Sequence, residues 1–201
     1  MFTQPILALG IGSVALIALL AIIVILVLYV ISCQRALVRL EEMLKNTLGQ
    51  IAVQVNSRWD ALTQLAKVVA SYSQYEHDTL VEVIRERRQS VSASDVSQVQ
   101  EQINASNSVL DRLFALAENY PQLRASENYQ QLQDSINVYE NNVRLQRMVY
   151  NDAATRYNNM VRMFPSNIIA RMFGYGVKDY FKEEAGKDTM PDLNLDFKKK
   201  D

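Results

Sequence analysis

The sequence has almost none of the residues that build common metal, redox and disulfide sites. In 201 residues it contains one cysteine and one histidine. A single cysteine excludes a disulfide scaffold and the usual thiolate zinc sites, and a single histidine excludes a histidine-rich metal site. The sequence also lacks a P-loop, a dinucleotide-binding glycine pattern and a nucleophile elbow. It therefore predicts a protein that is not an enzyme, with no catalytic residues, no metal site and no cofactor.

An excess of basic charge is lacking as well. The chain carries 21 Lys+Arg against 22 Asp+Glu, for a formal net charge of −1. Nucleic-acid-binding domains usually have a basic excess, because much of their affinity comes from contacts to phosphates. We therefore expect no nucleic-acid partner. All charged side chains lie from Arg35 onward, so the first 34 residues carry none.

This uncharged N-terminal region contains an apolar run from Ile6 to Ile31. As a helix these 26 residues would extend about 39 Å at roughly 1.5 Å per residue, and a bilayer core is about 30 Å thick. We predict a single transmembrane helix over Ile6 to Ile31, with the lipid bilayer as a partner. A cleaved signal sequence is the alternative, because Val30-Ile31-Ser32-Cys33 is similar to a lipobox in which Cys33 would be lipidated. Against it, no basic residue precedes the run.

The charges that flank the span predict its orientation. No Lys or Arg precedes it, whereas Arg35, Arg39 and Lys45 follow it closely. Because positive charge is retained on the cytoplasmic side, we expect a single-pass protein of the cell (inner) membrane with its N-terminus outside and its main domain in the cytoplasm.

Small and polar residues favour self-association. Ala8, Gly12 and Ala15 fall on one face of the predicted span, where small side chains let helices approach closely in lipid. Thr47 and Gln54 add polar positions to the helix that follows the membrane. We predict a homo-oligomer on these grounds, and the sequence identifies no other protein partner.

Turn-forming residues are scarce in the rest of the chain. Between Val14 and Phe173 there is one glycine, Gly49, and two prolines, and no Asn-Gly or Asp-Gly dipeptide occurs. Strands would have no tight turns to join them, so an all-α fold is expected. Apolar residues recur at alternating steps of three and four, a heptad pattern. The two longest such patterns are Val96, Val99, Ile103, Ser106, Leu110, Leu113, Ala117 and Tyr120, and Tyr129, Leu132, Ile136, Tyr139, Val143, Gln146, Tyr150, Ala153, Tyr157, Met160 and Phe164.

These patterns predict four helices near residues 34–54, 57–90, 95–120 and 126–164. A turn is expected at Asn56-Ser57, and helix N-caps within Ser92-Ala93-Ser94-Asp95 and at Ser126. Short connections favour antiparallel neighbours, hence an antiparallel up-and-down four-helix bundle of long coiled-coil-like helices behind the N-terminal transmembrane helix. The expected domains are a transmembrane anchor over 1–33, the bundle over 34–164, and a C-terminal capping segment with a charged tail over 165–201.

Residues 165–181 combine apolar, aromatic and basic side chains. If four helices alternate in direction, this segment lies at the membrane side of the bundle, where it either meets the headgroups or caps the open end of the bundle. Asn151-Asp152 and Asn158-Asn159, on the helix before it, either bond the backbone of the following loop or are simply polar surface.

Several of these motifs resemble the LemA family. Leu37-Val38-Arg39-Leu40 is similar to that family's opening pattern after the membrane. Thr63 replaces a family proline, and His77 lies one step off the family's histidine. The closest motif similarity is C-terminal, in Tyr150-Asn151-Asp152-Ala153, Phe164-Pro165-Ser166-Asn167-Ile168-Ile169-Ala170 and Phe173-Gly174-Tyr175. The resemblance implies a four-helix bundle associated with a membrane and no established enzymatic activity. Some members are lipoproteins, and one branch works in magnetosome membrane formation.

Two classes of function remain open. The first is a non-catalytic, membrane-anchored scaffold or membrane-organising component that self-assembles. The second is an accessory or ligand-binding membrane protein with a site at the open end of the bundle. The first is favoured, because a ligand site needs converging polar groups and the predicted core positions lack titratable ones.

Overall fold

A computed structural model describes residues 4–72, 85, 87 and 95–182, with side chains from residue 13 onward. These residues form α1 (Gln4–Tyr72), α3 (Val96–Ala117), α4 (Pro121–Arg124), α5 (Glu127–Arg162) and α6 (Ser166–Met172). No strand occurs in the described ranges. The all-α prediction is confirmed, together with a single long apolar helix at the N-terminus.

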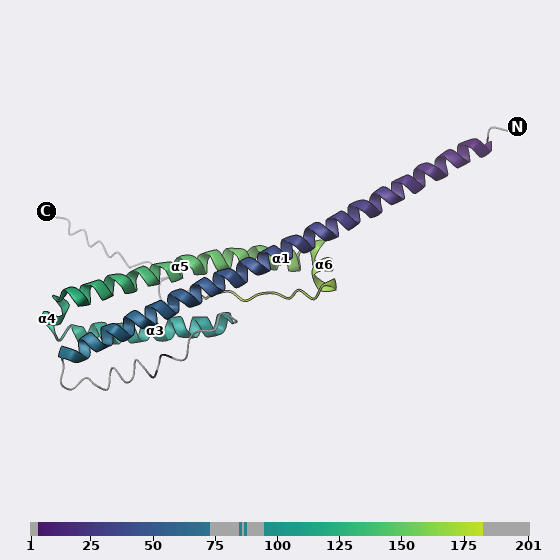
Figure 1. Cartoon of the computed structure of the whole chain (residues 1–201). Helices are drawn as coiled ribbons and strands as arrows, with labels where there is room; N and C mark the ends of the chain where they lie inside the picture. Colours follow the sequence, from purple (N-terminus) through teal and green to yellow (C-terminus); the bar gives the residue numbers. More distant parts are fainter. Residues whose placement is uncertain (1–3, 73–84, 86, 88–94, 183–201) are drawn as a thin grey trace, which may run out of the picture.

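The turn predicted at Asn56-Ser57 is wrong. α1 is one uninterrupted helix of 69 residues that passes through both positions (Figure 1). Asn and Ser weaken a helix only slightly, and the side chains beside them are fixed in the core. Val55 and Trp59 are each 1% exposed. Packing at these positions outweighs the weak turn signal. The predicted helix over 57–90 therefore belongs to α1 up to Tyr72, and nearly all of the remainder lies outside the described residues.

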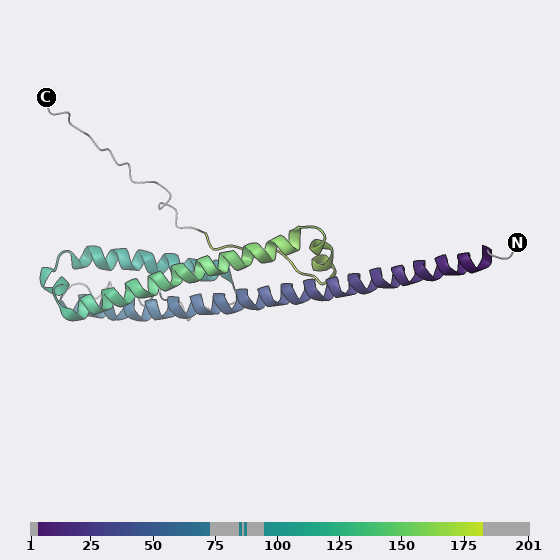
Figure 2. The same ribbon diagram turned by 90° about the horizontal axis from the view of Figure 1, so that it is seen from above.

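The three long helices lie side by side, but not all in alternating directions. α5 runs antiparallel to α1, whereas α3 runs parallel to α1 (Figures 1 and 2). Two contacts define the α1–α5 register: the Asn142 amide donates to Gln54 at 3.3 Å, and Arg58 pairs with Glu140 at 3.5 Å. The fourth helix of the predicted bundle would need residues 73–94, which are almost entirely outside the described residues.

Local signals predicted the other helix ends well. Asp95 is the N-cap of α3, and its carboxylate accepts from the Ser97 amide at 2.9 Å. Ser126 is the N-cap of α5, and its hydroxyl accepts from the Tyr129 amide at 3.4 Å. Pro121 starts the short α4, where its missing N–H leaves nothing unpaired.

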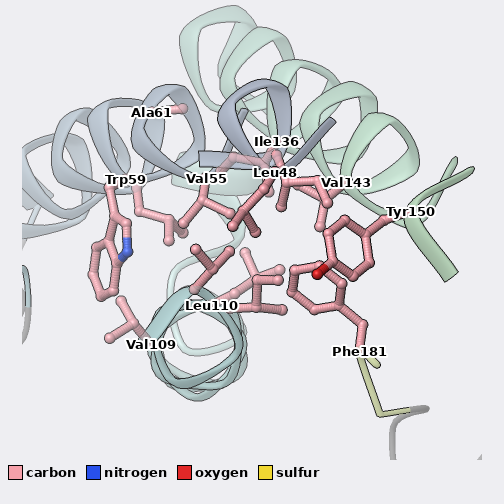
Figure 3. Close-up of a cluster of buried hydrophobic side chains, with 14 of the residues drawn as sticks. Leu48, Val55, Trp59, Ala61, Val109, Leu110, Ile136, Val143, Tyr150 and Phe181 are labelled. Carbon is pink, nitrogen blue, oxygen red and sulfur yellow. The ribbon is translucent and has the colours of Figure 1, made fainter. Parts of the chain in front are cut away.

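The heptad patterns form the core. In α3, Val99, Ile103, Leu110 and Leu113 are buried, and Val96 is half-buried at the first turn. The predicted pattern in α5 is likewise buried or half-buried, except that its last residue, Phe164, is 79% exposed. Figure 3 shows part of this core, in which side chains of α1, α3 and α5 meet. The buried positions of α1 include Leu37, Leu44, Leu48, Ile51, Val55, Leu62, Leu65 and Val69.

The helices differ in length, and this leaves part of the core to another segment. α3 has 22 residues and α5 has 36, so α3 covers only the half of the α1–α5 pair that lies away from the N-terminus. In the other half, residues 173–182 run extended beside α1 and α5 (Figure 1). We call this segment the strap.

Candidate functional site

One end of the bundle, which we call the base, carries the features that bear on function. It consists of α1 near residues 30–44, α5 from residue 147 onward, α6 and the strap. The apolar part of α1 projects from the base as a single free helix (Figure 2). Among the described residues, α1 is the helix long and apolar enough to cross a membrane. From Val14 to Tyr29 its side chains are exposed, whereas Val30 packs against the core. The bundle thus begins where the predicted span ends.

Cys33 lies one turn past this boundary. It sits within the continuous α1, is 5% exposed and belongs to the hydrophobic core. In the described fold its thiol therefore packs as a small apolar group. Lipid attachment at Cys33 would require cleavage of α1 before it, and this stays a prediction.

Two asparagines of α5 hold the strap through its backbone. The Asn158 amide donates to the Lys178 carbonyl at 2.9 Å and its oxygen accepts from the Lys178 N–H at 2.8 Å. Asn151 makes the same pair with Phe181, at 3.0 and 2.9 Å. Seven residues of helix and three of extended chain both span about 10 Å, so the two pairs are in register. Of the two interpretations made from the sequence, backbone bonding is confirmed for Asn151 and Asn158, whereas Asp152 and Asn159 are exposed.

Aromatic side chains of the strap pack against aromatic side chains of α5. Phe181 is 3% exposed and meets the Tyr150 ring edge-on, with 5.1 Å between centroids. Tyr175 meets Tyr157 in the same manner at 6.4 Å. The Arg147 guanidinium lies 5.8 Å from the Phe181 ring and also donates to the Lys182 carbonyl. These contacts make the strap an integral layer of the base.

An ion pair joins the strap to α1. Lys178 Nζ lies 2.9 Å from Glu41 Oε1 and 5.6 Å from the centre of the Tyr157 ring. The hydrogen bond from Lys178 lowers the pKa of Glu41 below its ordinary value, and burial opposes it. Burial raises the pKa of Tyr157 to about 12, with Glu41 adding to the effect. Tyr157 is therefore neutral at physiological pH, and within the described residues its hydroxyl has no hydrogen-bond partner.

In the middle of the bundle, the Arg58 side chain makes polar contacts with two other helices. This role was not predicted from the sequence. Its side chain is 3% exposed and donates to Ser106 at 3.1 Å and to Asn107 at 2.6 Å, besides pairing with Glu140. One residue thus ties α1 to both α3 and α5. Arg58 was not among the predicted core positions, so the core contains a titratable side chain that the heptad patterns did not predict. The available signal was spacing, because Arg58 lies three residues after Val55 and four before Leu62, in the step of the α1 core.

Thr47 and Gln54 have a different role from the one expected. Thr47 is buried and donates to the Met43 carbonyl at 2.8 Å, and Gln54 accepts from Asn142 inside the bundle. Neither offers a polar surface to a second copy. The positions of the Ala8 and Gly12 side chains lie outside the described part of the chain, and the small-residue face stays a prediction.

Among the described residues, each end of the bundle has buried apolar side chains. Leu123 of α4 is fully buried at one end, and Ile169 and Ala170 of α6 are buried at the base. In the described part of the chain no group of three or more His, Cys, Asp or Glu side chains is placed to hold a metal ion. His77 lies outside the described residues.

Comparison with known proteins gives the chain a family context. A family model described as LemA family matches residues 47–197, which include α3, α5, α6 and the strap. The chain is 32% identical over 80 residues to Magnetosome protein MamQ 2 of Paramagnetospirillum magneticum, covering 40% of this chain and 29% of that protein.

Two further relatives match over longer stretches at lower identity. Magnetosome protein MamQ of Magnetospirillum gryphiswaldense is 22% identical over 180 residues, covering 77% of this chain and 66% of its own length. Protein LemA of Metamycoplasma hominis is 26% identical over 140 residues, covering 67% of this chain and 62% of its own length. The chain therefore spans less than two thirds of each of these relatives. Together with the apolar part of α1, they indicate a membrane-associated helical protein.

Proposed function

Since the chain belongs to the LemA family, we propose that it is a non-catalytic, membrane-anchored scaffold that organises a membrane by assembling with copies of itself. The observation that carries this proposal is the continuity of α1, in which span and bundle are one helix without a break. A hinge between them would let the bundle turn freely. A continuous helix instead transmits the orientation of the span to every surface of the bundle. Copies that associate through their spans would then present their bundles in a fixed arrangement.

The proposal includes an orientation with the N-terminus outside and the bundle in the cytoplasm of a single-pass protein of the inner membrane. It is supported by Arg35 and Arg39, which are both exposed just past the span. The test is a variant with Ser97→Cys, an exposed position on α3. A membrane-impermeant thiol reagent should label it in permeabilised cells and not in intact ones. Labelling in intact cells would show the opposite orientation, with the bundle outside the cell membrane.

Self-assembly is proposed to run through the span. The described side chains from Val14 to Tyr29 are exposed, so lipid or another span must cover them. The small residues Ala8, Gly12 and Ala15 offer a face for close approach. The magnetosome proteins among the relatives support a membrane-organising task of this class.

The experiment is a particle-mass measurement of the full chain in nanodiscs and in mild detergents. We expect a defined oligomer that Gly12→Leu weakens, because the larger side chain blocks close approach. Gly10→Leu is the matched control, since position 10 lies on another face of the helix. Strictly monomeric particles under all conditions would exclude a self-assembling scaffold. If neither variant changes the oligomer, the interface between copies does not involve this face.

A ligand-binding role at the open end of the bundle was the alternative from the sequence. The burial of Leu123 at one end and of Ile169 and Ala170 at the base speaks against it. We therefore propose the scaffold alone.

A further inference from the structure

The base carries an exposed surface of apolar side chains that do not pack in the core of the bundle. Phe164 is 79% exposed, Met172 67%, Met163 61%, Ile168 59% and Phe173 44%. Met163 and Phe164 directly follow α5, Ile168 and Met172 belong to α6, and Phe173 is the residue after α6. Scattered single apolar residues are ordinary on a protein surface, but five within eleven positions of the chain form a concentration that needs a partner.

α6 is built to present this surface. Its next two residues after Ile168, Ile169 and Ala170, are buried against the bundle, and α6 packs on both α1 and α5. Ile168 and Met172 are four residues apart and so share one side of the short helix. With the other side fixed in the core, these two side chains project outward from the base.

The charge around this surface has one sign. Arg162 and Arg171 flank it, and Arg35 and Arg39 lie on the adjoining part of α1; all four are exposed. No acidic residue occurs in residues 30–40 or in residues 160–177. Within these two ranges the charged side chains are therefore all cationic, whereas acidic residues of the base such as Glu41 and Asp179 lie outside them. Apolar and aromatic side chains among arginines suit the headgroup region of an anionic leaflet.

The position of this apolar and cationic surface in the molecule also suits contact with a membrane. α6 lies beside α1 at the point where the helix leaves the bundle and becomes the free apolar stretch (Figure 2). If that stretch crosses a bilayer, the base faces the bilayer surface, and the exposed apolar residues continue the apolar surface of the span sideways. A second protein would have to fit between the base and the lipid.

We propose that Arg162, Met163, Phe164, Ile168, Arg171, Met172 and Phe173 form a second membrane contact, the basal patch, which inserts into the headgroup region of an anionic leaflet. The proposal rests on the membrane anchoring proposed above. One helix through a bilayer leaves a protein free to rotate about the helix axis and to tilt. A patch to one side of that axis removes this freedom, and so fixes which face of the bundle looks along the membrane toward a neighbouring copy.

The test places tryptophan reporters in the full chain, reconstituted in phosphatidylglycerol vesicles with brominated acyl chains. Phe164→Trp and Met172→Trp report on the basal patch. Val138→Trp, at a 56% exposed position on α5 away from the base, is the matched control. Val24→Trp reports on the span. The native Trp59 is 1% exposed in the core and supplies a constant background that the unsubstituted protein measures.

We expect the brominated lipid to quench the reporters at 164 and 172, with loss of their quenching by aqueous iodide, and to leave the reporter at 138 untouched. Iodide quenching alone at 164 and 172, with lipid quenching at 24, would overturn the basal patch while leaving the anchor intact. Lipid quenching at none of the four positions would overturn the anchor itself. Lipid quenching at 138 as well would mean that the whole bundle lies on the bilayer, which also contradicts the proposal.

The charge requirement is tested by a double substitution, Arg162→Glu with Arg171→Glu, introduced into the Met172→Trp variant. Quenching by brominated lipid should weaken in phosphatidylglycerol vesicles and change much less in phosphatidylcholine vesicles, because only the former attract the arginines. Arg124→Glu with Arg144→Glu alters the net charge equally at exposed sites away from the base. Equal effects of the two double substitutions would remove the electrostatic part of the proposal.

Discussion

Asn151 and Asn158 show how a residue that suits its local structure poorly can reveal a distant contact. Asparagine lowers helix stability because its side chain competes for backbone hydrogen bonds. Both residues nevertheless lie well inside α5, and each has its amide paired with one backbone unit of the strap. The pairs replace the partners that an extended strap lacks, since no strand lies beside it among the described residues.

Replacing Asn158 by Ala should therefore destabilise the base. The substitution leaves the Lys178 N–H and carbonyl without their partner at a position where Asn158 is 2% exposed. The expected loss is about 1–3 kcal/mol of unfolding free energy. Urea unfolding in mild detergent measures it. The neighbouring Asn159→Ala, at an exposed position, is the control and should change stability by less than about 0.5 kcal/mol. Equal effects at the two sites would mean that the hydrogen bonds between Asn158 and Lys178 contribute nothing to stability.

Glu41 gives the base a pH dependence whose sign follows from its pKa. The folded-state pKa lies below the ordinary value of about 4.3, because Lys178 hydrogen-bonds the charged carboxylate. The stabilisation is therefore complete above the ordinary pKa and is lost as the pH falls through the lowered one. Because both side chains are partly exposed, Glu41→Gln should cost no more than about 1 kcal/mol at neutral pH. The difference from the unsubstituted protein should vanish in acid. A difference that persists unchanged in acid would contradict the ion-pair origin.

At the scale of helices, the apolar period proved a better guide than the turn signals. The heptad patterns of α3 and α5 and both N-caps follow from local sequence, because each depends on neighbours within a few residues. The end of a helix in mid-bundle is different. Asn56 and Ser57 would tolerate a turn, but the burial of Val55, Arg58 and Trp59 decides against one, and this depends on α3 and α5.

The same distinction separates what could and could not be predicted of the base. The composition of residues 165–181 pointed to the membrane side, and they do lie at the end of the bundle from which the apolar stretch emerges. The predicted reason was incorrect, since α1 makes no turn at Asn56. α5 returns to the base because α3 runs parallel to α1. The role of Arg58 required knowing which helices meet at its position, and no local pattern supplies that.

Proline at position 57 distinguishes a continuous α1 from two helices joined there. In a continuous helix, Ser57→Pro removes a hydrogen bond and clashes with the preceding turn, at a cost of roughly 3 kcal/mol or more. At the start of a separate helix the same proline would be tolerated. We expect a large drop in the thermal midpoint by circular dichroism, and little change for Ser57→Ala. If the proline variant were as stable as the alanine variant, the result would support a turn at Asn56-Ser57 and contradict a continuous α1.

The described part of the chain is an elongated rod in which two kinds of surface follow each other along one axis. α1 has 69 residues, or roughly 100 Å at about 1.5 Å per residue. Its first part has exposed apolar side chains, and its second part has one face packed in the core. The change between them occurs at Val30 to Cys33, within a few residues of the first positive charges. The apolar stretch, the base and the rest of the bundle therefore follow each other along one continuous helix without a linker.

The two parts should nevertheless be separable in stability. Removing residues 1–33 takes away little of the core beyond Cys33, while Leu37, Leu44 and the strap contacts remain. We expect a soluble, helical fragment that unfolds cooperatively, as measured by circular dichroism and gel filtration. A largely disordered fragment would show that the span supports the fold. Removing residues 1–44 is the matched comparison. It deletes Leu37, Leu44 and Glu41, which are buried or half-buried in the base. Loss of the two leucines alone should cost about 2–5 kcal/mol each. The longer deletion should therefore lose the cooperative transition that the shorter one keeps.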